Sequence, residues 1–170
     1  MNLFVRFFWC WVQIKNKKHS VDVLIKQHFR IWPHDMGWRL HLPNFRFLSF
    51  MELGRFHYWY GVKSELKRAS GSRLIAAQDM VYIRPVSFLA KLDMATYVLG
   101  WDEKYVYFKH DFYVGKSLVA TGLVKEACVA NGAVISPNDI FCGETPQETG
   151  SLLESWRVMQ AEVKALSDPR

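Results

Sequence analysis

Four polar side chains lie just before and within one apolar stretch of the chain, residues 32–55, and their types suit acid–base chemistry. They are Asp35, His41, Asn44 and Glu52. A carboxylate or a neutral imidazole can take a proton from water, and an amide can hold an oxygen atom of a substrate. The stretch therefore contains candidates for a general base and for a positioning group.

Glu52 is the strongest general-base candidate. On a helix, its neighbours three, four and seven positions away are largely apolar, and they include Leu48, Phe56 and Trp59. Burial among such side chains raises the pKa of a carboxyl group and suits it to proton abstraction. The alternative, which we favour, is an ion pair with Arg55, one turn along the helix, which would keep Glu52 ionised and occupied.

The other three candidates each have a structural alternative. His41 is either a base or a group that orients substrate, but a histidine just before a helix is commonly a hydrogen-bonded structural residue. Asp35 can position a water molecule, but an aspartate in a Pro-x-Asp turn commonly stabilises that turn, which is the interpretation we favour. Asn44 can approach a carbonyl group or cap the helix that follows it.

The element that positions Glu52 is a helix predicted from Asn44 to about Tyr60, with Gly61 as its C-terminal stop. The helix is apolar on nearly every side, so protein or lipid must enclose it. Because it is too short and too interrupted by charge to span a bilayer, we expect the rest of the chain to enclose it.

Strands predicted on both sides of this helix are rich in β-branched and aromatic residues. Their expected ranges are 22–31, 73–84, 91–99, 104–113 and 117–129. Short turns between the last four indicate an antiparallel sheet.

The end of the chain is predicted to contain a loop over residues 131–150 and an amphipathic helix over residues 151–166. The expected apolar face of this helix is formed by Leu152, Trp156, Met159 and Val163.

The first residues form an aromatic segment, LFVRFFWCWVQI at positions 3–14, followed by Lys15, Lys17 and Lys18. It is shorter than a spanning helix, contains Arg6 and lacks a small-residue cleavage site, which disfavours a signal peptide. It can lie at a membrane interface, pack on the domain or form an oligomer contact. Aromatic residues beside lysines suit an anionic membrane, and we hypothesise peripheral membrane contact.

Composition and length predict one globular domain. The chain has 170 residues, half of them hydrophobic, and a formal net charge of +6 that can attract phosphates or an acidic membrane face. No nucleic-acid-binding motif is evident, and Cys10, Cys128 and Cys142 have no metal-site or CxxC spacing. We expect a cytoplasmic location, with the inner membrane surface as the alternative.

Several segments resemble, in order and spacing, those of hotdog-fold thioesterases. They are Pro33-His34-Asp35, His41, Asn44, FLSFMELGRF, YIRPVSF and LGWDEKYVYFKHDF. The resemblance is greatest to the 4-hydroxybenzoyl-CoA thioesterase branch and the mammalian thioesterase-superfamily-member proteins, and it covers residues 26–137. It implies an α+β hotdog fold, with a five-stranded antiparallel sheet around the long helix. The expected parts are the N-terminal segment 1–20, the hotdog domain 21–137 and the C-terminal loop and helix 138–170.

The resemblance also implies an activity, the hydrolysis of a fatty-acyl or aryl thioester of coenzyme A or acyl carrier protein, without a cofactor. Glu52 or His41 would activate water, and the amides at the start of the long helix would hold the oxyanion. Arg84 and Lys91 would meet the phosphates of coenzyme A if they lie near the pocket mouth. The alternative, which we favour for each, is a solvated surface position. Relatives pair side by side with sites at the interface, so a homodimer or tetramer is expected.

One departure from the family pattern concerns the loop before the helix. Relatives carry Asp-x-Asp or Asp-x-Asn-x-His there, whereas this chain keeps Asp35 and His41 but has Gly37 and Arg39 at the positions between them. Glycine can neither attack nor abstract a proton. The alternative function is therefore a protein that binds acyl thioesters without hydrolysing them.

Overall fold

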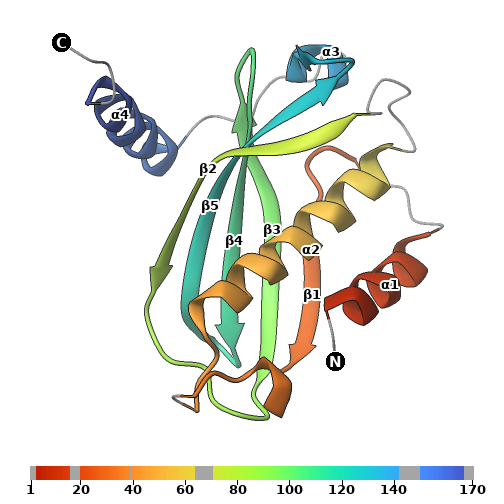
Figure 1. Ribbon diagram of the computed structural model, residues 1–170, viewed down its shortest axis with the longest axis vertical. Helices are drawn as coiled ribbons and strands as arrows, with labels where there is room; N and C mark the ends of the chain where they lie inside the picture. The colour runs from red at the N-terminus through yellow and green to blue at the C-terminus, as the bar shows by residue number, and fades with distance from the viewer. Residues whose placement is uncertain (1–2, 16–19, 39, 64–70, 142–149, 167–170) are drawn as a thin grey trace.

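The computed structural model describes residues 3–15, 20–38, 40–63, 71–141 and 150–166. A long helix lies across a curved antiparallel sheet, which confirms the expected α+β hotdog fold (Figure 1). In chain order the elements are α1 (Leu3–Ile14), β1 (Ile25–Arg30), the 3₁₀ turn η1 (Pro33–Asp35), α2 (Asn44–Lys63), β2 (Ser72–Tyr82), β3 (Lys91–Trp101), β4 (Val106–Val114), β5 (Ser117–Ala130), β6 (Ala133–Ile135), α3 (Pro137–Phe141) and α4 (Ser151–Ala165).

The sheet has the strand order β1-β3-β4-β5-β2, and every pairing is antiparallel. The short β6 pairs with the end of β5, beyond Glu126, which pairs with the first residue of β4. This order makes β1 and β2 the two edges of the sheet, on opposite sides of the molecule (Figure 1).

The core lies between α2 and the facing side of the sheet. Phe47 and Tyr58 of α2 are almost fully buried and contact the inward-facing rings of Phe112 and Phe108 on β4. Gly54 allows α2 to approach β3, because a Cβ atom there would lie 2.3 Å from Thr96 Oγ1. Close packing is therefore built into the middle of the helix.

The predicted end of α2 at Gly61 is wrong, because the helix continues to Lys63. A glycine inside a helix costs about 1 kcal/mol relative to alanine. Both Gly61 and Val62 are buried, so tertiary packing of the last turn outweighs that local preference.

The N-terminal segment is a helix that packs on the domain, one of its three predicted arrangements. Arg6, Cys10 and Ile14, spaced four residues apart, are its buried side chains. Beside them, the ring of Phe7 lies 4.1 Å from the ring of Phe56 on α2, centroid to centroid.

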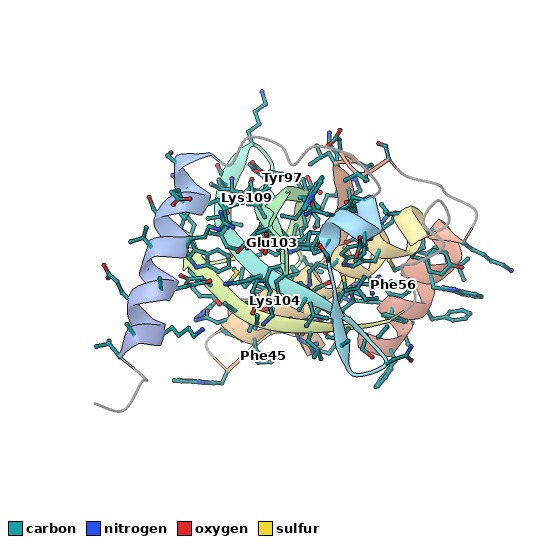
Figure 2. All side chains as sticks on the ribbon, turned by 90° about the horizontal axis from the view of Figure 1, so that it is seen from above. Phe45, Phe56, Tyr97, Glu103, Lys104 and Lys109 are labelled. Carbon is teal, nitrogen blue, oxygen red and sulfur yellow. The ribbon has the colours of Figure 1, made fainter. Side chains whose placement is uncertain are left out.

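The helix α4 packs on the face of the sheet opposite α2, and Figure 2 shows α1 and α4 at opposite sides of the molecule. Its predicted buried face is wrong in part. Trp156 is buried as expected, together with Leu153. The other three predicted positions, Leu152, Met159 and Val163, are 49%, 44% and 62% exposed.

The physical reason lies in the partners of α4. Leu153 and Trp156 contact Tyr107 and Leu123, which point away from α2. Arg157, next to Trp156 on the same helix face, donates to Asp102 Oδ2 at 2.8 Å. The face of α4 that packs on the sheet is therefore the one that carries Leu153 and Arg157.

The expectation of a loop over residues 131–150 is wrong for its first part, which forms β6 and α3. Three and five residues are too few for a periodic pattern to appear in the sequence. The second element is held by tertiary contacts, because Trp101 Nε1 donates to Asn138 Oδ1 at 3.0 Å and the Trp101 ring lies 4.5 Å from that of Phe141. Cys142 lies outside the described residues.

Candidate active site

A pocket of about 240 Å³ lies at the N-terminal end of α2, and we call it the α2 pocket. It brings together three of the predicted site residues, His41, Asn44 and Arg84. Phe47 and Tyr82 are among its other walls. The pocket therefore lies where positive helix dipole and polar side chains coincide.

The loop before α2 fixes the position of His41. The Gly37 amide donates to the His41 carbonyl at 3.2 Å, and Leu40 adopts a positive φ of 58°. His41 also forms a β-bridge with Ser87. On the other side of His41, the Leu42 amide donates to Val86 O at 2.9 Å. These contacts hold the backbone of His41 beside the loop that carries Arg84.

The first turn of α2 supplies amide donors. The Arg46 amide bonds to Pro43 O at 2.9 Å. The first amides of a helix have no acceptor within the helix, so those of Asn44 and Phe45 are candidate oxyanion donors. The side chain of Asn44 is exposed at the pocket, where a ligand can reach its amide group.

Tyr82 was missed by the sequence analysis. Its hydroxyl donates to Asn44 O at 3.4 Å, and its ring packs edge-on against Phe47 with 5.5 Å between centroids. Burial raises the pKa of Tyr82, so its hydroxyl stays protonated near neutral pH. Because its proton is directed to Asn44 O, the hydroxyl oxygen is offered to the pocket as an acceptor. A sequence signal existed, because Tyr82 is two residues before Arg84 on a predicted strand and so shares its face.

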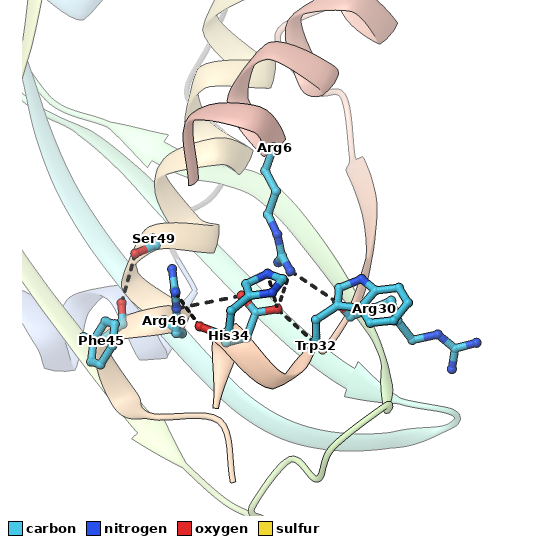
Figure 3. Close-up of polar contacts among 8 residues, drawn as sticks. Arg6, Arg30, Trp32, His34, Phe45, Arg46 and Ser49 are labelled. Atoms are coloured by element: carbon cyan, nitrogen blue, oxygen red, sulfur yellow. Dashed lines mark hydrogen bonds and ion pairs between the residues drawn. The ribbon is translucent and has the colours of Figure 1, made fainter. Parts of the chain in front are cut away.

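Asp35 is in the η1 turn, not in the α2 pocket. Its carboxylate is 1% exposed, accepts the Trp32 amide at 3.0 Å and pairs with the guanidinium of Arg6 (Figure 3). Arg46 Nε is 3.8 Å from its other oxygen. This agrees with the structural interpretation of Asp35 and adds an unexpected partner from α1.

Glu52 faces a different cavity, of about 340 Å³, which we call the Glu52 cavity. The expected burial of Glu52 is wrong, because its side chain is exposed at the rim. The alternative, a pair between Glu52 and Arg55, is replaced by a bond from Arg55 Nε to Glu126 Oε2 at 2.8 Å. Glu52 is thus an accessible carboxylate rather than a buried one.

A buried ionic cluster forms the floor of the Glu52 cavity. Glu126 accepts from Arg55 and, at 2.6 Å, from Trp59 Nε1. The guanidinium of Arg73 lies 4.2 Å from the Trp59 ring. Burial raises the pKa of Glu126 and lowers that of Arg55, although each partner opposes the shift of the other. The sequence signal was the position of Glu126, which shares the inward-facing parity of Val124 on β5.

The remaining predicted residues lie elsewhere. Lys91 is exposed at the start of β3, opposite Arg30 of β1, and does not line the α2 pocket. Arg39 lies outside the described residues. Burial raises the pKa of both Cys10 and Cys128 to about 11, which keeps these thiols protonated. Over the described ranges, no cluster of three or more His, Cys, Asp or Glu side chains is placed to hold a metal ion.

Comparison with known proteins identifies one family. Residues 31–139, more than half of the chain, match the thioesterase-like superfamily. Protein THEM6 of Danio rerio is 27% identical over 144 residues, which span 81% of this chain and 69% of that protein.

Solved structures share the fold at low sequence identity. A probable thioesterase from Bartonella henselae has a TM-score of 0.59 and 16% identity over 67% of this chain and 98% of its own. A thioesterase from Thermus thermophilus, solved with coenzyme A and Zn, has a TM-score of 0.59 and 19% identity over 69% of this chain and 93% of its own.

Proposed function

The chain belongs to the thioesterase-like superfamily, and we propose that it hydrolyses a fatty-acyl or aryl thioester of coenzyme A or acyl carrier protein. The α2 pocket is the observation that supports this most directly. It has His41, the Tyr82 hydroxyl and the first amides of α2 around one volume. Arg84 lies at the same pocket and suits a phosphate of the carrier.

In the proposed reaction, water adds to the thioester carbonyl and the amides of Asn44 and Phe45 stabilise the oxyanion. One of His41 and Glu52 takes the proton from the attacking water, and the other orients the water or the substrate. Collapse of the tetrahedral intermediate breaks the C–S bond, and the thiolate takes a proton to leave as free thiol. The products are a carboxylic acid and the carrier thiol.

Within one copy of the chain, the two candidate bases, His41 and Glu52, lie in different cavities. Glu52 is eight residues after Asn44, which is about 12 Å along a helix. The α2 pocket includes Tyr82 at one end of β2, whereas the Glu52 cavity includes Arg73 near the other end. Within one chain, Glu52 and the oxyanion donors therefore lie at different cavities.

Pairing of two copies through β2 would unite the two sites. This edge strand exposes apolar side chains, with Leu74, Ile75 and Val81 between 49% and 58% exposed. An antiparallel β2–β2 contact about a two-fold axis places each end of β2 beside the opposite end of the second strand. The Glu52 cavity of one copy then adjoins the α2 pocket of the other. We propose a homodimer, or a tetramer built from it, with this composite site.

The test is a hydrolysis screen over acyl-CoA chain lengths and aryl-CoAs, measuring release of the free thiol beside a binding assay. His41→Ala and Glu52→Gln should each lower kcat about 100-fold or more. Glu103→Gln, an exposed carboxylate change outside both cavities, is the control. Full activity in both site variants would remove these residues from the mechanism.

Gly37 supports the alternative function, acyl-thioester binding without turnover. That alternative predicts saturable binding of an acyl-CoA and no release of thiol in the same screen. Release of thiol by the unmodified protein, lost in His41→Ala, would exclude it.

The outer face of α1 supports a peripheral membrane contact at the inner surface of a cytoplasmic membrane. Phe4, Phe8 and Trp9 are 81%, 62% and 60% exposed, and the exposed Lys15 follows them. Aromatic rings beside a cation suit the interface of an anionic bilayer. No helix in the described part of the chain is long and apolar enough to cross a membrane.

Sedimentation with anionic vesicles tests the membrane contact. The protein should enter the pellet, and Phe4→Ser with Phe8→Ser should release it. The matched control is Val158→Ser with Val163→Ser, which alters two exposed apolar residues of α4. A protein that stays in the supernatant with anionic vesicles would contradict the contact.

A further inference from the structure

A separate cavity of about 340 Å³ lies between α1 and β1, and we call it the α1 cavity. It is at the edge of the sheet opposite β2, and so on the other side of the sheet from the proposed composite site. Residues of α1, which precede the family match at 31–139, form one of its walls. Its volume is in the range of small-molecule sites, about 300–1,000 Å³.

The lining of the α1 cavity combines cations with aromatic rings. Lys26 and Arg30 are exposed at its rim, and Trp9 and Trp32 are 60% and 45% exposed. None of the described lining residues is acidic. The cavity therefore offers a positive rim and apolar surfaces that remain in contact with solvent.

The deepest cation is Arg6, which is only 6% exposed. Its Nη2 atom donates to Arg30 O at 3.3 Å and to the carboxylate of Asp35 (Figure 3). Its Nε and Nη1 atoms have no hydrogen-bond partner among the described residues. The guanidinium lies 5.0 Å from the Phe50 ring centroid, so it is held against an apolar surface.

A buried donor without an acceptor carries a desolvation penalty of about 1–3 kcal/mol, and more when the group is charged. An anion seated in the cavity would offset that penalty at Arg6. Gln27 adds no donor for the anion, because its Nε2 atom donates to Cys10 Sγ at 3.3 Å and its buried Oε1 atom can only accept.

We infer that the α1 cavity binds an amphipathic anion, a carboxylate on an alkyl or aryl body. The anionic group lies toward Arg6 and the rim cations, and the apolar body lies against Trp9, Phe29 and Trp32. The same chemistry is present in the acid released by thioester hydrolysis, and only that link depends on the proposed function. Binding itself requires no turnover.

The probe is decanoate, titrated calorimetrically into the full chain below its micelle concentration, beside decanol of equal chain length. Decanoate should bind at one site, and decanol should bind about tenfold more weakly or worse, because it lacks the charge. Lys26→Glu and Trp9→Ala should each weaken decanoate binding about tenfold. Both residues are exposed, so these variants are expected to fold.

Matched controls change exposed residues of the same types outside the cavity. Lys116→Glu, in the β4–β5 turn, and Trp38→Ala, in the loop before α2, should leave decanoate binding unchanged. His41→Ala should also leave it unchanged, since His41 lines the α2 pocket. Competition by anionic vesicles, lost in Lys26→Glu, would identify a lipid as the source of the anion.

Several results would overturn the inference. They are absence of decanoate binding, equal binding of decanol, and unchanged decanoate binding in both Lys26→Glu and Trp9→Ala. Loss of binding in His41→Ala would also overturn it, by assigning decanoate to the α2 pocket. None of these results depends on whether the protein hydrolyses a thioester.

Discussion

Asp35→Asn separates a structural from a catalytic aspartate. In the structure the change removes the charge that faces Arg6, and both side chains are almost fully buried, at 1% and 6% exposed. Breaking a buried ion pair by removing one partner costs about 3–5 kcal/mol, because the other charge remains buried. For a chain of this size each kcal/mol lowers Tm by roughly 2–4 °C. We therefore expect Tm to fall by roughly 6–20 °C.

That loss has an upper limit set by α1. If α1 detaches, Arg6 becomes solvated, and the cost cannot exceed the free energy with which α1 packs on the domain. Amides of residues 6–14 would then exchange rapidly with deuterium while those of α2 stay protected. Urea unfolding and hydrogen exchange together therefore detect the loss in either form.

A double-mutant cycle with Arg6→Gln isolates the pair. The coupling between the two changes should be at least about 1 kcal/mol, because the side chains are in direct contact. Glu103→Gln, an exposed carboxylate change, should stay within about 0.5 kcal/mol. The structural role of Asp35 would be refuted if Asp35→Asn lost most of its turnover while its stability and the exchange protection of α1 stayed unchanged.

Three further changes test other parts of the structure. Gly54→Ala should lower the free energy of unfolding by about 1–3 kcal/mol in urea, because the new Cβ would lie 2.3 Å from Thr96 Oγ1; an unchanged midpoint would contradict the close packing. Gly37→Asp should fold normally, since its Cβ would lie 3.6 Å from Pro43. It should raise kcat about tenfold or more, because it adds a carboxylate that can act as a general base. Gly37→Asn is the control, and an equal gain in kcat in that variant would contradict a general-base role. Burial opposes ionisation of Asp102, but bonds from a tyrosine hydroxyl, two backbone amides and an arginine outweigh it and lower the pKa of Asp102 below 3.8. Its stabilisation is therefore full well above pH 3.8 and lost as pH falls through the lower folded-state pKa, so the difference in unfolding free energy between the protein and Asp102→Asn should shrink between about pH 5 and 3.

The hotdog fold could be predicted because its main signals are local. The alternation in the strands and the apolar sequence of α2 each specify an element, and their order fits one arrangement. The face of α4 could not be predicted, because residues 152 and 153 are both leucines and only the contacts with Tyr107 and Leu123 select between them.

The candidate site was predictable in its parts but not in its grouping. Three of the residues expected at the site, His41, Asn44 and Arg84, line the α2 pocket. Glu52 was expected in the same site. Helical periodicity predicts which face of α2 carries Glu52, but it does not predict which part of that face other elements leave exposed. The partner of Arg55 was also misassigned, since Glu126 is 71 residues away in sequence and pairing across the core has no local signal.

Mixing of two inactive variants tests the composite thioesterase site most directly. Glu52→Gln and His41→Ala are purified separately, combined in equal amounts under conditions that exchange subunits, and assayed for release of thiol from an acyl-CoA that the unmodified protein hydrolyses. Half of the resulting dimers are mixed, and each has one intact site of two, so activity should recover to roughly a quarter of the unmodified level. Activity that stays at the level of the two separate variants after proven exchange would contradict a site shared between copies.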